Sequence, residues 1–482
     1  MGYQTSLLWF RNDLRLHDNE ALHTALQTSK SIVPIYILDP RHFIKTRFGF
    51  VKTGPFRAHF LFQSLQNLNS NLEALGNTLH FAIGKPEECL PNIAKEVGAE
   101  AIYHHLESTS EEVAVEKALL KNLPDSVKLH GFWGSTLFHP FDLPFHISKL
   151  PDVFTEFRKQ VEKRSKVRPV FPSPQSIPSF KWGHSLNLDF PSEYLPKLPP
   201  ESRGVMGNQG FEGGESAALR RLQHYLWETE NIVTYKETRN GLLGESYSSK
   251  FSPWLANGSL SARKVYREIK RFEEQRISNQ STYWLIFELI WRDYFRFYAA
   301  KHGNQIFYRS GIKQELRTVQ KNPTTTPSLF EAWRDGNTGF PFIDANMREL
   351  KQTGFMSNRG RQNVASFLVH DLGLDWRMGA EYFESILIDY DVCSNYGNWN
   401  YVAGVGSDPR ENRYFNVIKQ SHDYDPQGEY IRTWIPELTS LSSPEIHFPY
   451  ASELSGAPSL FEPKSPIHYP KPIVRQKYSP PK

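Results

Sequence analysis

The sequence predicts two parts: an N-terminal α/β domain built on a doubly wound parallel sheet, and a C-terminal all-helical domain. The first ~150 residues alternate short apolar runs with amphipathic stretches, the pattern of a parallel sheet covered by helices on both faces. From about residue 206 onward, apolar residues recur only with helical spacing. A chain of 482 residues is also too long for one core of about 100–200 residues.

The N-terminal part contains five short apolar runs that we expect to be buried strands, at residues 6–10, 31–39, 78–84, 101–105 and 127–134. Helical patterns lie between them at 19–29, 57–75 and 111–123. Sheets of this kind bind ligands at the carboxyl ends of their strands. The dinucleotide fingerprint G-x-G-x-x-G is absent, which argues against a simple Rossmann dehydrogenase.

A proline-rich linker separates the two parts, because residues 165–203 hold eight prolines and cannot form regular structure. The clearest helical patterns follow at 214–228, 261–277, 283–300, 328–336, 363–373 and 380–391. The last ~40 residues carry nine prolines and suggest a wrapping or disordered tail. We therefore expect an α/β domain at 1–160, a connector at 161–205, a helical domain at 206–440 and a tail at 441–482.

The composition excludes several classes of protein and favours a flat ligand. Cys89 and Cys393 are too few for a disulfide framework or a cysteine-rich zinc site, and no metal-ligand spacing occurs. The 33 Phe, 22 Tyr and 11 Trp residues offer many faces for stacking. The net charge of +4 permits a phosphate-rich partner without requiring one. Since no signal peptide and no run of ~18 apolar residues is visible, we expect a cytoplasmic protein without a membrane span, and a monomer.

The apolar helix expected at 283–298 carries charges at selected positions. Glu288 and Arg292 are four residues apart, and Trp291 and Phe295 have the same spacing. Trp291 could stack on a base, Glu288 could accept its N–H groups, and Arg292 could hold a phosphate. The alternative is a structural ion pair on a core helix.

A second constellation lies in residues 354–367, which begin with a Gly-Phe turn and enter a helix. Asn358, Arg361 and Gln362 fall on one face of that helix, whose N-terminus could favour an anion. The alternative is N-capping by Ser357 or Asn358 with solvated arginines.

A third constellation is the hydroxyl-rich segment 235–261. Ser248, Ser249 and Ser252 come just before a helix that we expect to start near Pro253. Their hydroxyls and free backbone N–H groups could cradle a diphosphate, although serine-rich loops without a ligand are common.

Residues 387–401, LIDYDVCSNYGNWNY, place two carboxylates, an amide and an indole close together: Asp389, Asp391, Asn395 and Trp399. The segment starts like a buried helix and ends like a polar turn broken by glycine. Taken alone, a helix C-terminus followed by a solvated turn explains it equally well.

Four motifs occur in order: LLWFRNDLRLHDNEAL (7–22), ELIWRDYFRFY (288–298), TGFPFIDANMRELKQTGFMSNRGRQNVASFL (338–368) and the segment 387–401. Together they resemble the photolyase/cryptochrome family, and the resemblance runs from about Ser6 to Pro436. TRNGLLG, YSSKFSPWLANGSLS and NWNYVAGVGSDPRENRYFN are most similar to the DASH-type cryptochromes.

This resemblance implies an α/β antenna domain, a helical domain that holds FAD, and a cleft for a cyclobutane pyrimidine dimer. By motif position, the residues that would contact FAD are Tyr235, Ser248, Ser249, Ser252, Arg292, Asn358, Arg361, Asp389, Asp391 and Asn395. Arg361 would pair with Asp389 near the flavin ring, and Asn395 would face flavin N5. The lesion pocket would use Glu288, Trp291, Gln362 and Tyr401.

The resemblance also implies an electron relay in which Trp399 is the proximal donor and Trp376 the second. The family's outer relay tryptophan is missing, because no Trp occurs between Trp291 and Trp333. A tyrosine, a rerouted tryptophan or solvent exposure of Trp376 could replace it.

Further partners follow from the same resemblance. Glu107 lies where relatives bind a reduced folate antenna, 5,10-methenyltetrahydrofolate; the alternative is a solvated glutamate at a helix start. Arg239, Arg359 and Arg413 are candidates for DNA phosphate contacts. The paired histidines of the (6-4) repair branch are absent, since the first histidine after that motif is His370.

We therefore expect light-dependent repair of pyrimidine dimers, mainly in single-stranded DNA, by electron transfer from reduced FAD. One alternative is a blue-light photoreceptor that binds DNA without repair, and another is a flavin redox protein. Asn395 and the Glu288/Trp291 pair favour repair, and the short tail weakly disfavours signalling.

Overall fold

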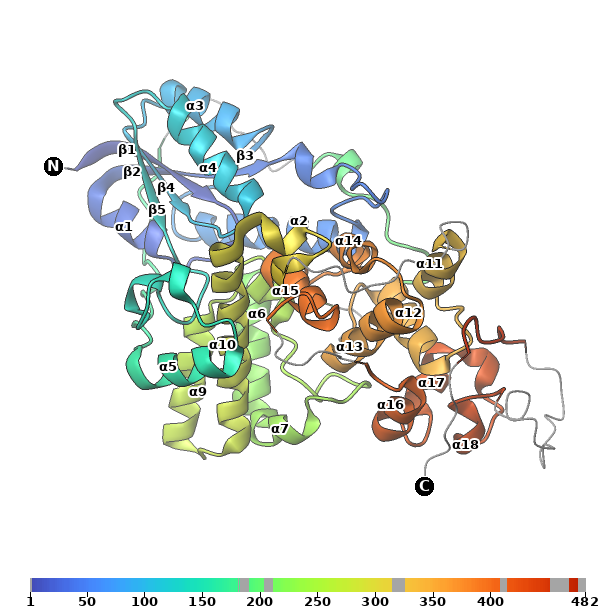
Figure 1. Ribbon diagram of the computed structural model, residues 1–482. Helices are drawn as coiled ribbons and strands as arrows, with labels where there is room; N and C mark the ends of the chain where they lie inside the picture. Colours follow the sequence, from blue (N-terminus) through green and yellow to red (C-terminus); the bar gives the residue numbers. More distant parts are fainter. Residues whose placement is uncertain are drawn as a thin grey trace.

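A five-stranded parallel sheet organises the N-terminal part of the molecule (Figure 1). The computed structural model describes residues 2–180, 182, 190–202, 211–313, 326–407, 414–450 and 468–475. The strands are β1 Tyr3–Phe10, β2 Ser29–Leu38, β3 His80–Ile83, β4 Ala101–His105 and β5 Lys128–Phe132, in the order β3-β2-β1-β4-β5. All neighbouring strands pair in parallel, so the predicted doubly wound sheet is confirmed.

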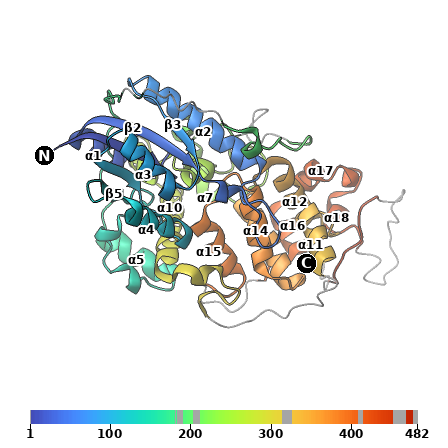
Figure 2. The same ribbon diagram turned by 90° about the horizontal axis from the view of Figure 1, so that it is seen from above.

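Helices cover both faces of this sheet (Figure 2). They are α1 Glu20–Thr28, α2 Pro55–Glu73, α3 Pro86–Glu96 and α4 Ser110–Asn122. Leu8 and Phe10 of β1 pack with α1 and α2, whereas Leu7 and Trp9 pack with α3 and α4. This alternation follows from the two-residue period of a strand and explains why the strands are apolar throughout.

Helix α3 was not predicted, because Pro91 lies inside it. A proline cannot donate to the carbonyl four residues earlier, which here belongs to Glu87. Asn122 Nδ2 donates to that Glu87 carbonyl at 2.9 Å instead. A side chain from α4 thus replaces the missing backbone hydrogen bond, a compensation that the local sequence does not reveal.

From residue 211 onward the described chain is mainly helical, as predicted, and helix α5, which the sequence reasoning did not predict, lies before the proline-rich residues 165–203. The helices are α5 Phe154–Arg164, α6 Glu215–Gln223, α7 Tyr235–Thr238, α8 Ser252–Ala256, α9 Ala262–Gln275, α10 Gln280–His302, α11 Thr326–Asp335, α12 Pro341–Thr353, α13 Asn358–Ser366, α14 Trp376–Ile386, α15 Val392–Val402, α16 Val417–Tyr424, α17 Glu429–Trp434 and α18 Ser443–Ile446. No described helix is long and apolar enough to cross a membrane. The boundaries expected at residues 160, 205 and 440 stay predictions.

The alternative of a helix C-terminus followed by a solvated turn in residues 387–401 is wrong, and the helix predicted at 380–391 ends earlier than expected. Helix α14 already ends at Ile386, and a new helix, α15, begins after Asp391. The carboxylate of Asp391 accepts from the backbone N–H of Ser394 at 2.8 Å and so caps α15. Because Asn395 and Trp399 then lie in a regular helix, both are positioned by packing rather than by a loose turn.

The described pieces of the proline-rich tail pack onto the helical part. Phe448, Tyr450 and Tyr469 are buried, and the Tyr469 hydroxyl donates to the carboxylate of Asp344 at the start of α12. These pieces of the tail therefore wrap around the helical part, which is one of the two arrangements that the sequence suggests, a wrapping tail rather than a disordered one.

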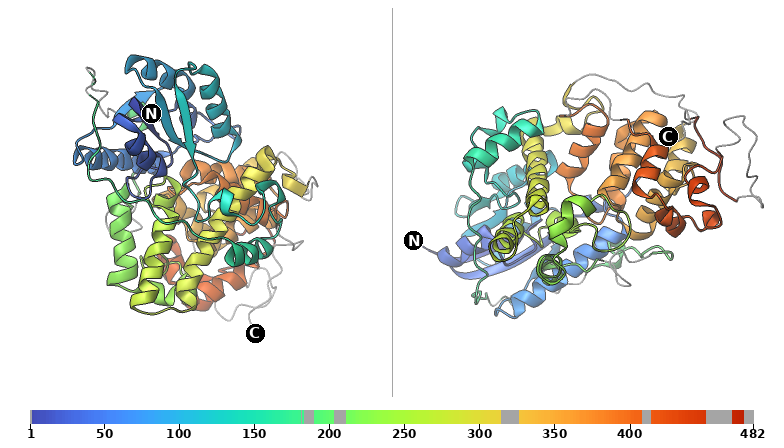
Figure 3. Two further views of the ribbon diagram at one scale, coloured as in Figure 1. Left: turned by 90° about the vertical axis from the view of Figure 1, so that its left-hand side faces the viewer. Right: turned by 90° about the horizontal axis from the view of Figure 1, so that it is seen from below.

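The sheet part lies against the helical part through the segment that follows β1 (Figure 3). The buried guanidinium of Arg15 donates to the carbonyl of Gly258 at 2.8 Å, and the carboxylate of Asp18 pairs with the guanidinium of Arg263 on α9 at 2.8 Å. Gly258 has a φ of +73°, and a Cβ there would lie 1.9 Å from the carbonyl oxygen of Asn12. The crevice beside β1, where open α/β sheets usually bind ligands, is thus used to dock the helical part.

The Asp18–Arg263 pair gives a stability prediction. Both side chains are buried, so Asp18→Asn leaves an uncompensated guanidinium in the interface. We expect a loss of about 3–5 kcal/mol in the free energy of unfolding, measured by urea denaturation followed by circular dichroism. Lys270→Ala on the same helix removes an exposed ion pair with Glu273 and should cost at most about 1 kcal/mol. Equal effects of the two substitutions would contradict this view of the interface.

Candidate functional site

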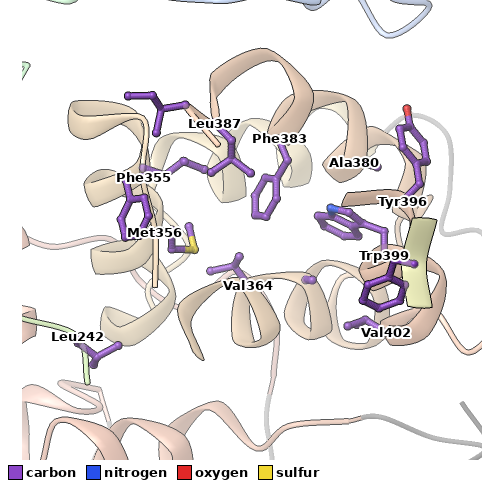
Figure 4. Close-up of a cluster of buried hydrophobic side chains, with 14 of the residues drawn as sticks. Leu242, Phe355, Met356, Val364, Ala380, Phe383, Leu387, Tyr396, Trp399 and Val402 are labelled. Carbon is purple, nitrogen blue, oxygen red and sulfur yellow. The ribbon is translucent and has the colours of Figure 1, made fainter. Parts of the chain in front are cut away.

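An open cavity lies between α13, α14 and α15. Its lining residues are Asn358, Arg361, Gln362, Ala365, Phe383, Leu387, Asp389, Tyr390, Asp391, Ser394, Asn395, Asn398, Trp399 and Val402. Apolar side chains form part of the wall, and Figure 4 shows Phe383, Leu387, Trp399 and Val402 in one cluster. A cavity that combines an apolar wall with convergent polar groups is typical of a cofactor or small-molecule site.

Arg361 and Asp389 form the charged edge of the cavity. Arg361 Nη2 lies 2.8 and 3.0 Å from the two carboxylate oxygens of Asp389, and its Nε donates to the Met356 carbonyl at 2.9 Å. The Asp389 side chain is 1% exposed and that of Arg361 is 26% exposed. The carboxylate therefore holds the guanidinium in place while part of the positive charge faces the cavity. The two residues that the resemblance pairs do meet in space.

Asp391 connects the cavity to the sheet part through Arg296 of α10. Arg296 Nη2 lies 2.5 Å from Asp391 Oδ2, and its Nη1 lies 3.4 Å from Glu107 Oε2. Burial alone would raise the pKa of Asp391, but Arg296 and Arg292 outweigh it and lower this pKa below the usual value. Asp391 is therefore an anion at neutral pH. Arg296 was missed by the sequence reasoning, although a charged residue in an apolar helix is a signal for a buried pair.

Glu107 is not a solvated glutamate. It is buried three residues before α4, and Asn12 Nδ2 donates to its Oε1 at 2.9 Å. With Arg296 on its other oxygen, Glu107 lies where the sheet part meets α10. The solvated alternative considered from the sequence is therefore wrong.

Asn395 and Trp399 project from one side of α15. Asn395 Nδ2 donates to the carbonyl of Ala380 at 3.0 Å, which leaves Oδ1 to meet a donor in the cavity. The indole of Trp399 packs edge to face on Phe383 at 5.2 Å. A Cβ at Gly379 of α14 would lie 2.2 Å from the Trp399 ring, so only glycine permits this close approach. Trp399 is fixed in the cavity wall as a result.

The serine-rich segment is held by Arg221 of α6, which the sequence reasoning missed. Arg221 donates to the carbonyls of Glu245, Ser248 and Ser249 at 2.8, 3.2 and 3.0 Å. Since C=O and N–H point to opposite sides of a peptide, this clamp turns the following N–H groups away from Arg221. Lys250 has a φ of +55°, and such a turn is typical of backbone sites for anions.

Two further residues that we expect to act together with this segment each lie at the start of a helix. Ser252 begins α8 and is exposed, and Tyr235 begins α7 and is buried. Burial, together with the carboxylate of Glu288, raises the pKa of Tyr235 and keeps the phenol neutral.

Glu288 and Arg292 do not pair with each other. Glu288 forms an ion pair with Arg239 of the segment after α7. The two terminal nitrogens of Arg292 donate to the carbonyls of Ser135 and Leu255, the latter at 2.8 Å. Burial lowers the pKa of Arg292 to about 10. The core ion pair considered for Arg292 is therefore wrong, because Arg292 links α8 to the segment after β5. Its contact with a phosphate stays a prediction.

Trp291 lies in an aromatic group outside the cavity. One face of its ring stacks on Phe154 at 3.5 Å, and its edge meets the ring of Tyr401 at 6.0 Å. Tyr401 belongs to α15, two residues after Trp399. Gln362 lines the cavity, and its buried Oε1 has no hydrogen-bond partner in the described structure, as expected of an atom that awaits a ligand.

The second expected relay residue is enclosed. Trp376 is 1% exposed, and its indole N–H donates to the Arg309 carbonyl at 3.0 Å. Solvent exposure of Trp376 therefore does not replace the missing outer tryptophan. The segment in which that tryptophan would occur lies mostly at 314–325, outside the described residues.

Two of the three expected phosphate contacts can be placed. Arg239 is engaged by Glu288, and Arg359 donates to Asn240 Oδ1 at 3.1 Å. The Arg359 guanidinium also lies over the ring of Tyr424 at 4.4 Å. Arg413 lies outside the described residues.

The chain matches two family models that together cover most of its length. Residues 6–176 match the model described as DNA photolyase, and residues 284–480 match the FAD binding domain of DNA photolyase. A cryptochrome DASH from Synechocystis sp. is 54% identical over 449 residues, which are 92% of this chain and 90% of that protein.

Solved structures show the same similarity in three dimensions. The crystal structure of the Synechocystis sp. PCC6803 cryptochrome has a TM-score of 0.89 and 51% identity, and the match covers 98% of this chain and 97% of that one. A class III photolyase from Agrobacterium tumefaciens has a TM-score of 0.84 and 30% identity, with 98% and 95% of the chains covered.

These similarities fit the chemistry of the cavity. A flavin needs flat apolar walls, which Phe383 and Leu387 offer, and polar groups at its edge, which Arg361 and Asn395 offer. The cofactor is FAD, and the partner of the family is DNA. The chain therefore belongs to the photolyase/cryptochrome family, in its cryptochrome DASH branch, whose activities are light-dependent DNA repair or photoreception.

Proposed function

We propose that this protein is a lyase that repairs cyclobutane pyrimidine dimers under blue or near-ultraviolet light, mainly in single-stranded DNA. One observation carries the proposal: α15 presents Asn395 and Trp399 to the cofactor cavity and Tyr401 to Trp291. Asn395 and Tyr401 are six residues apart, or about 9 Å along a helix axis. A dimer held at the aromatic pair would thus lie within short electron-transfer distance of the cavity.

The residues that we propose to hold FAD are Tyr235, Ser248, Ser249, Ser252, Arg292, Asn358, Arg361, Asp389, Asp391 and Asn395. When bound, reduced FAD supplies the electron that opens the cyclobutane ring of the dimer. Arg361 offers positive charge beside the ring, and Asp389 keeps the guanidinium oriented. Asn395 would offer its Oδ1 as an acceptor to a ring N–H of the bound flavin, because its Nδ2 is held by the Ala380 carbonyl.

The lesion pocket that we propose uses Glu288, Trp291, Gln362 and Tyr401. Burial raises the pKa of Glu288, and Arg239 opposes this rise. Glu288 can accept from the N–H groups of a base, and Gln362 offers a buried amide oxygen. Arg239 and Arg359 are the proposed phosphate contacts of the single strand, together with Arg413.

The preference for single strands follows from the flipping cost. A dimer in a duplex must leave the base stack, which costs a few kcal/mol, whereas a single strand largely avoids this cost. Trp291 has one face covered by Phe154, and Tyr401 is smaller than an indole, so the aromatic contact is modest. A base–aromatic contact contributes about 1–3 kcal/mol, comparable with the cost of flipping. We propose that the protein acts as a cytoplasmic monomer.

The substrate prediction compares one dimer-containing oligonucleotide as a single strand and in a duplex, under the same light and salt. We expect the single strand to be repaired at least about tenfold faster. Tyr401→Trp adds stacking area and should narrow the difference. Equal rates with the unaltered protein would contradict the proposal, and no repair of either substrate would favour the photoreceptor function.

Trp399 should be the first protein residue to give an electron to the oxidised cofactor under light. Trp399→Phe keeps an aromatic ring at this position but removes the easily oxidised indole. We expect FAD to stay bound while the rate of light-driven reduction by an external thiol falls at least about tenfold. Trp227→Phe, on the segment after α6, is the control and should leave the rate unchanged. An unchanged rate in Trp399→Phe would show that another route dominates.

Glu107 is the proposed anchor of a reduced folate antenna. Folate should add near-ultraviolet absorption to that of FAD when 5,10-methenyltetrahydrofolate is titrated into the FAD-loaded protein. Glu107→Gln should weaken this binding at least about tenfold because a charged acceptor is lost, whereas Glu111→Gln on the exposed face of α4 should not. Tight folate binding by Glu107→Gln would remove Glu107 from the site.

A further inference from the structure

Two aromatic branches lead away from Trp399, the tryptophan in the cavity wall. In one, Trp399 meets Trp333 at 6.5 Å, and Trp333 meets Tyr382 at 5.9 Å. In the other, the Trp399 ring packs against Gly379 of α14, which lies one helical turn after Trp376. The ring of Trp376 in turn meets the ring of Tyr396 edge to face, with the ring centroids 6.1 Å apart. Each branch ends in a tyrosine, and the surroundings of these two phenols differ.

An oxidised tryptophan in either branch cannot be stabilised by losing its N–H proton. The indoles of Trp333 and Trp376 are 0% and 1% exposed, and their N–H groups donate to the carbonyls of Val364 and Arg309 at 3.0 Å. A backbone carbonyl is a poor base, so neither indole can lose its proton and trap the oxidation. The electron given up by Trp399 then returns quickly unless a further group supplies a replacement.

Tyr396 combines two properties that such a group needs. It precedes Trp399 by three residues on α15, so the two side chains are neighbours on the helix surface, as Figure 4 shows. Its hydroxyl donates to Glu384 Oε2 on α14 at 3.5 Å, and both side chains are buried. In the described structure, the hydroxyl of Tyr382 is hydrogen-bonded to no carboxylate.

We propose that Tyr396 is the terminal protein donor of the relay and that Glu384 is its proton acceptor, an assignment that rests on the light-driven oxidation of Trp399. Oxidised Trp376 or Trp399 takes one electron from the phenol of Tyr396. The O–H proton moves at the same time to the carboxylate of Glu384. The products are a neutral tryptophan, a neutral tyrosyl radical and a protonated glutamate. An external thiolate then gives one electron and becomes a thiyl radical, while Glu384 returns its proton to the phenol oxygen, so that Tyr396 and the Glu384 carboxylate are both restored.

The charges around Tyr396 support this assignment. Burial raises the pKa of Glu384, which makes its carboxylate a stronger base. Burial followed by the carboxylates of Glu384 and Glu381 raises the pKa of Tyr396, so the phenol keeps its proton until it is oxidised. Arg47 pairs with Glu381 at 3.0 Å and is 49% exposed, which places the protein surface one layer beyond this cluster. An electron from an external reductant therefore needs to cross only that layer to reach Tyr396.

The experiment uses the full-length protein loaded with oxidised FAD, without DNA. Illuminated samples are frozen and examined by electron paramagnetic resonance, with and without ring-deuterated tyrosine. We expect a radical signal that deuteration narrows, and its loss in Tyr396→Phe and Glu384→Gln. In both variants, light-driven reduction by dithiothreitol should slow at least about tenfold. Tyr382→Phe is the matched control for the other branch and should change neither the signal nor the rate.

Tyr396→Trp tests the chemistry independently of packing. An indole at 396 adds one electron-transfer step toward the surface near Arg47 and needs no proton transfer to Glu384. This variant should therefore recover part of the rate by reaching the external reductant, and adding Glu384→Gln to it should have little further effect. The flavin absorption of every variant reports that FAD is bound and the domain folded. A radical signal unaffected by deuteration, an unchanged rate in Tyr396→Phe, or an equal loss in Tyr382→Phe would overturn the proposal. Because DNA is absent, a failure of repair does not affect these outcomes.

Discussion

The buried charges between the sheet and the helices are the constraint on which the rest of this structure depends. Arg15 and Asp18 lie in the segment after β1 and are held by groups of the helical part. Arg15 donates to the Gly258 carbonyl, and Asp18 pairs with the Arg263 guanidinium. Neither charge could stay in this low-dielectric interface alone, because removal of one partner leaves the other unsolvated. The contact therefore fixes the sheet's carboxyl edge against the helical part and closes the usual ligand crevice of such a sheet.

The same interface continues to the cofactor cavity. Arg296 lies between Glu107, beside the sheet, and Asp391, in the cavity wall. Asp391 is also the N-cap of α15, so its carboxylate orders the helix that carries Asn395 and Trp399. A group bound at Glu107 and a flavin in the cavity would thus share one buried guanidinium.

Helix α15 can serve both the cofactor and the substrate because its neighbours lie unusually close. A Cβ at Gly397 would come within 2.2 Å of the Phe295 ring on α10, and one at Gly379 would meet Trp399 at the same distance. The two glycines let α15 lie tightly between α10 and α14. One side of the helix then faces the cavity, another brings Tyr401 to Trp291, and a third places Tyr396 beside Glu384.

Much of this architecture follows from the sequence alone. The five strands and the long helices α9 and α10 are visible because their burial is uniform or periodic, and periodicity is a local property. The motifs around Arg361, Asp389 and Asn395 point to a flavin by resemblance, and the structure brings these residues into one cavity. Helix α3 and the start of α15 escaped the same reasoning, because Asn122 compensates for Pro91 from another helix and Asp391 is a cap that resembles a turn.

Tertiary structure alone decided which charges and rings meet. Glu288 and Arg292 share a helix face at a spacing suited to an ion pair, yet Glu288 pairs with Arg239 and Arg292 with two backbone carbonyls. Trp376, Tyr396 and Glu384 belong to two helices whose relative placement no local pattern encodes. The sequence alone determines the hydrophobic spacing and the side-chain chemistry of each helix and strand, because both depend on residues that are close together along the chain. The partner of a buried charge or an oxidisable ring is chosen by packing between elements, where desolvation makes every contact specific.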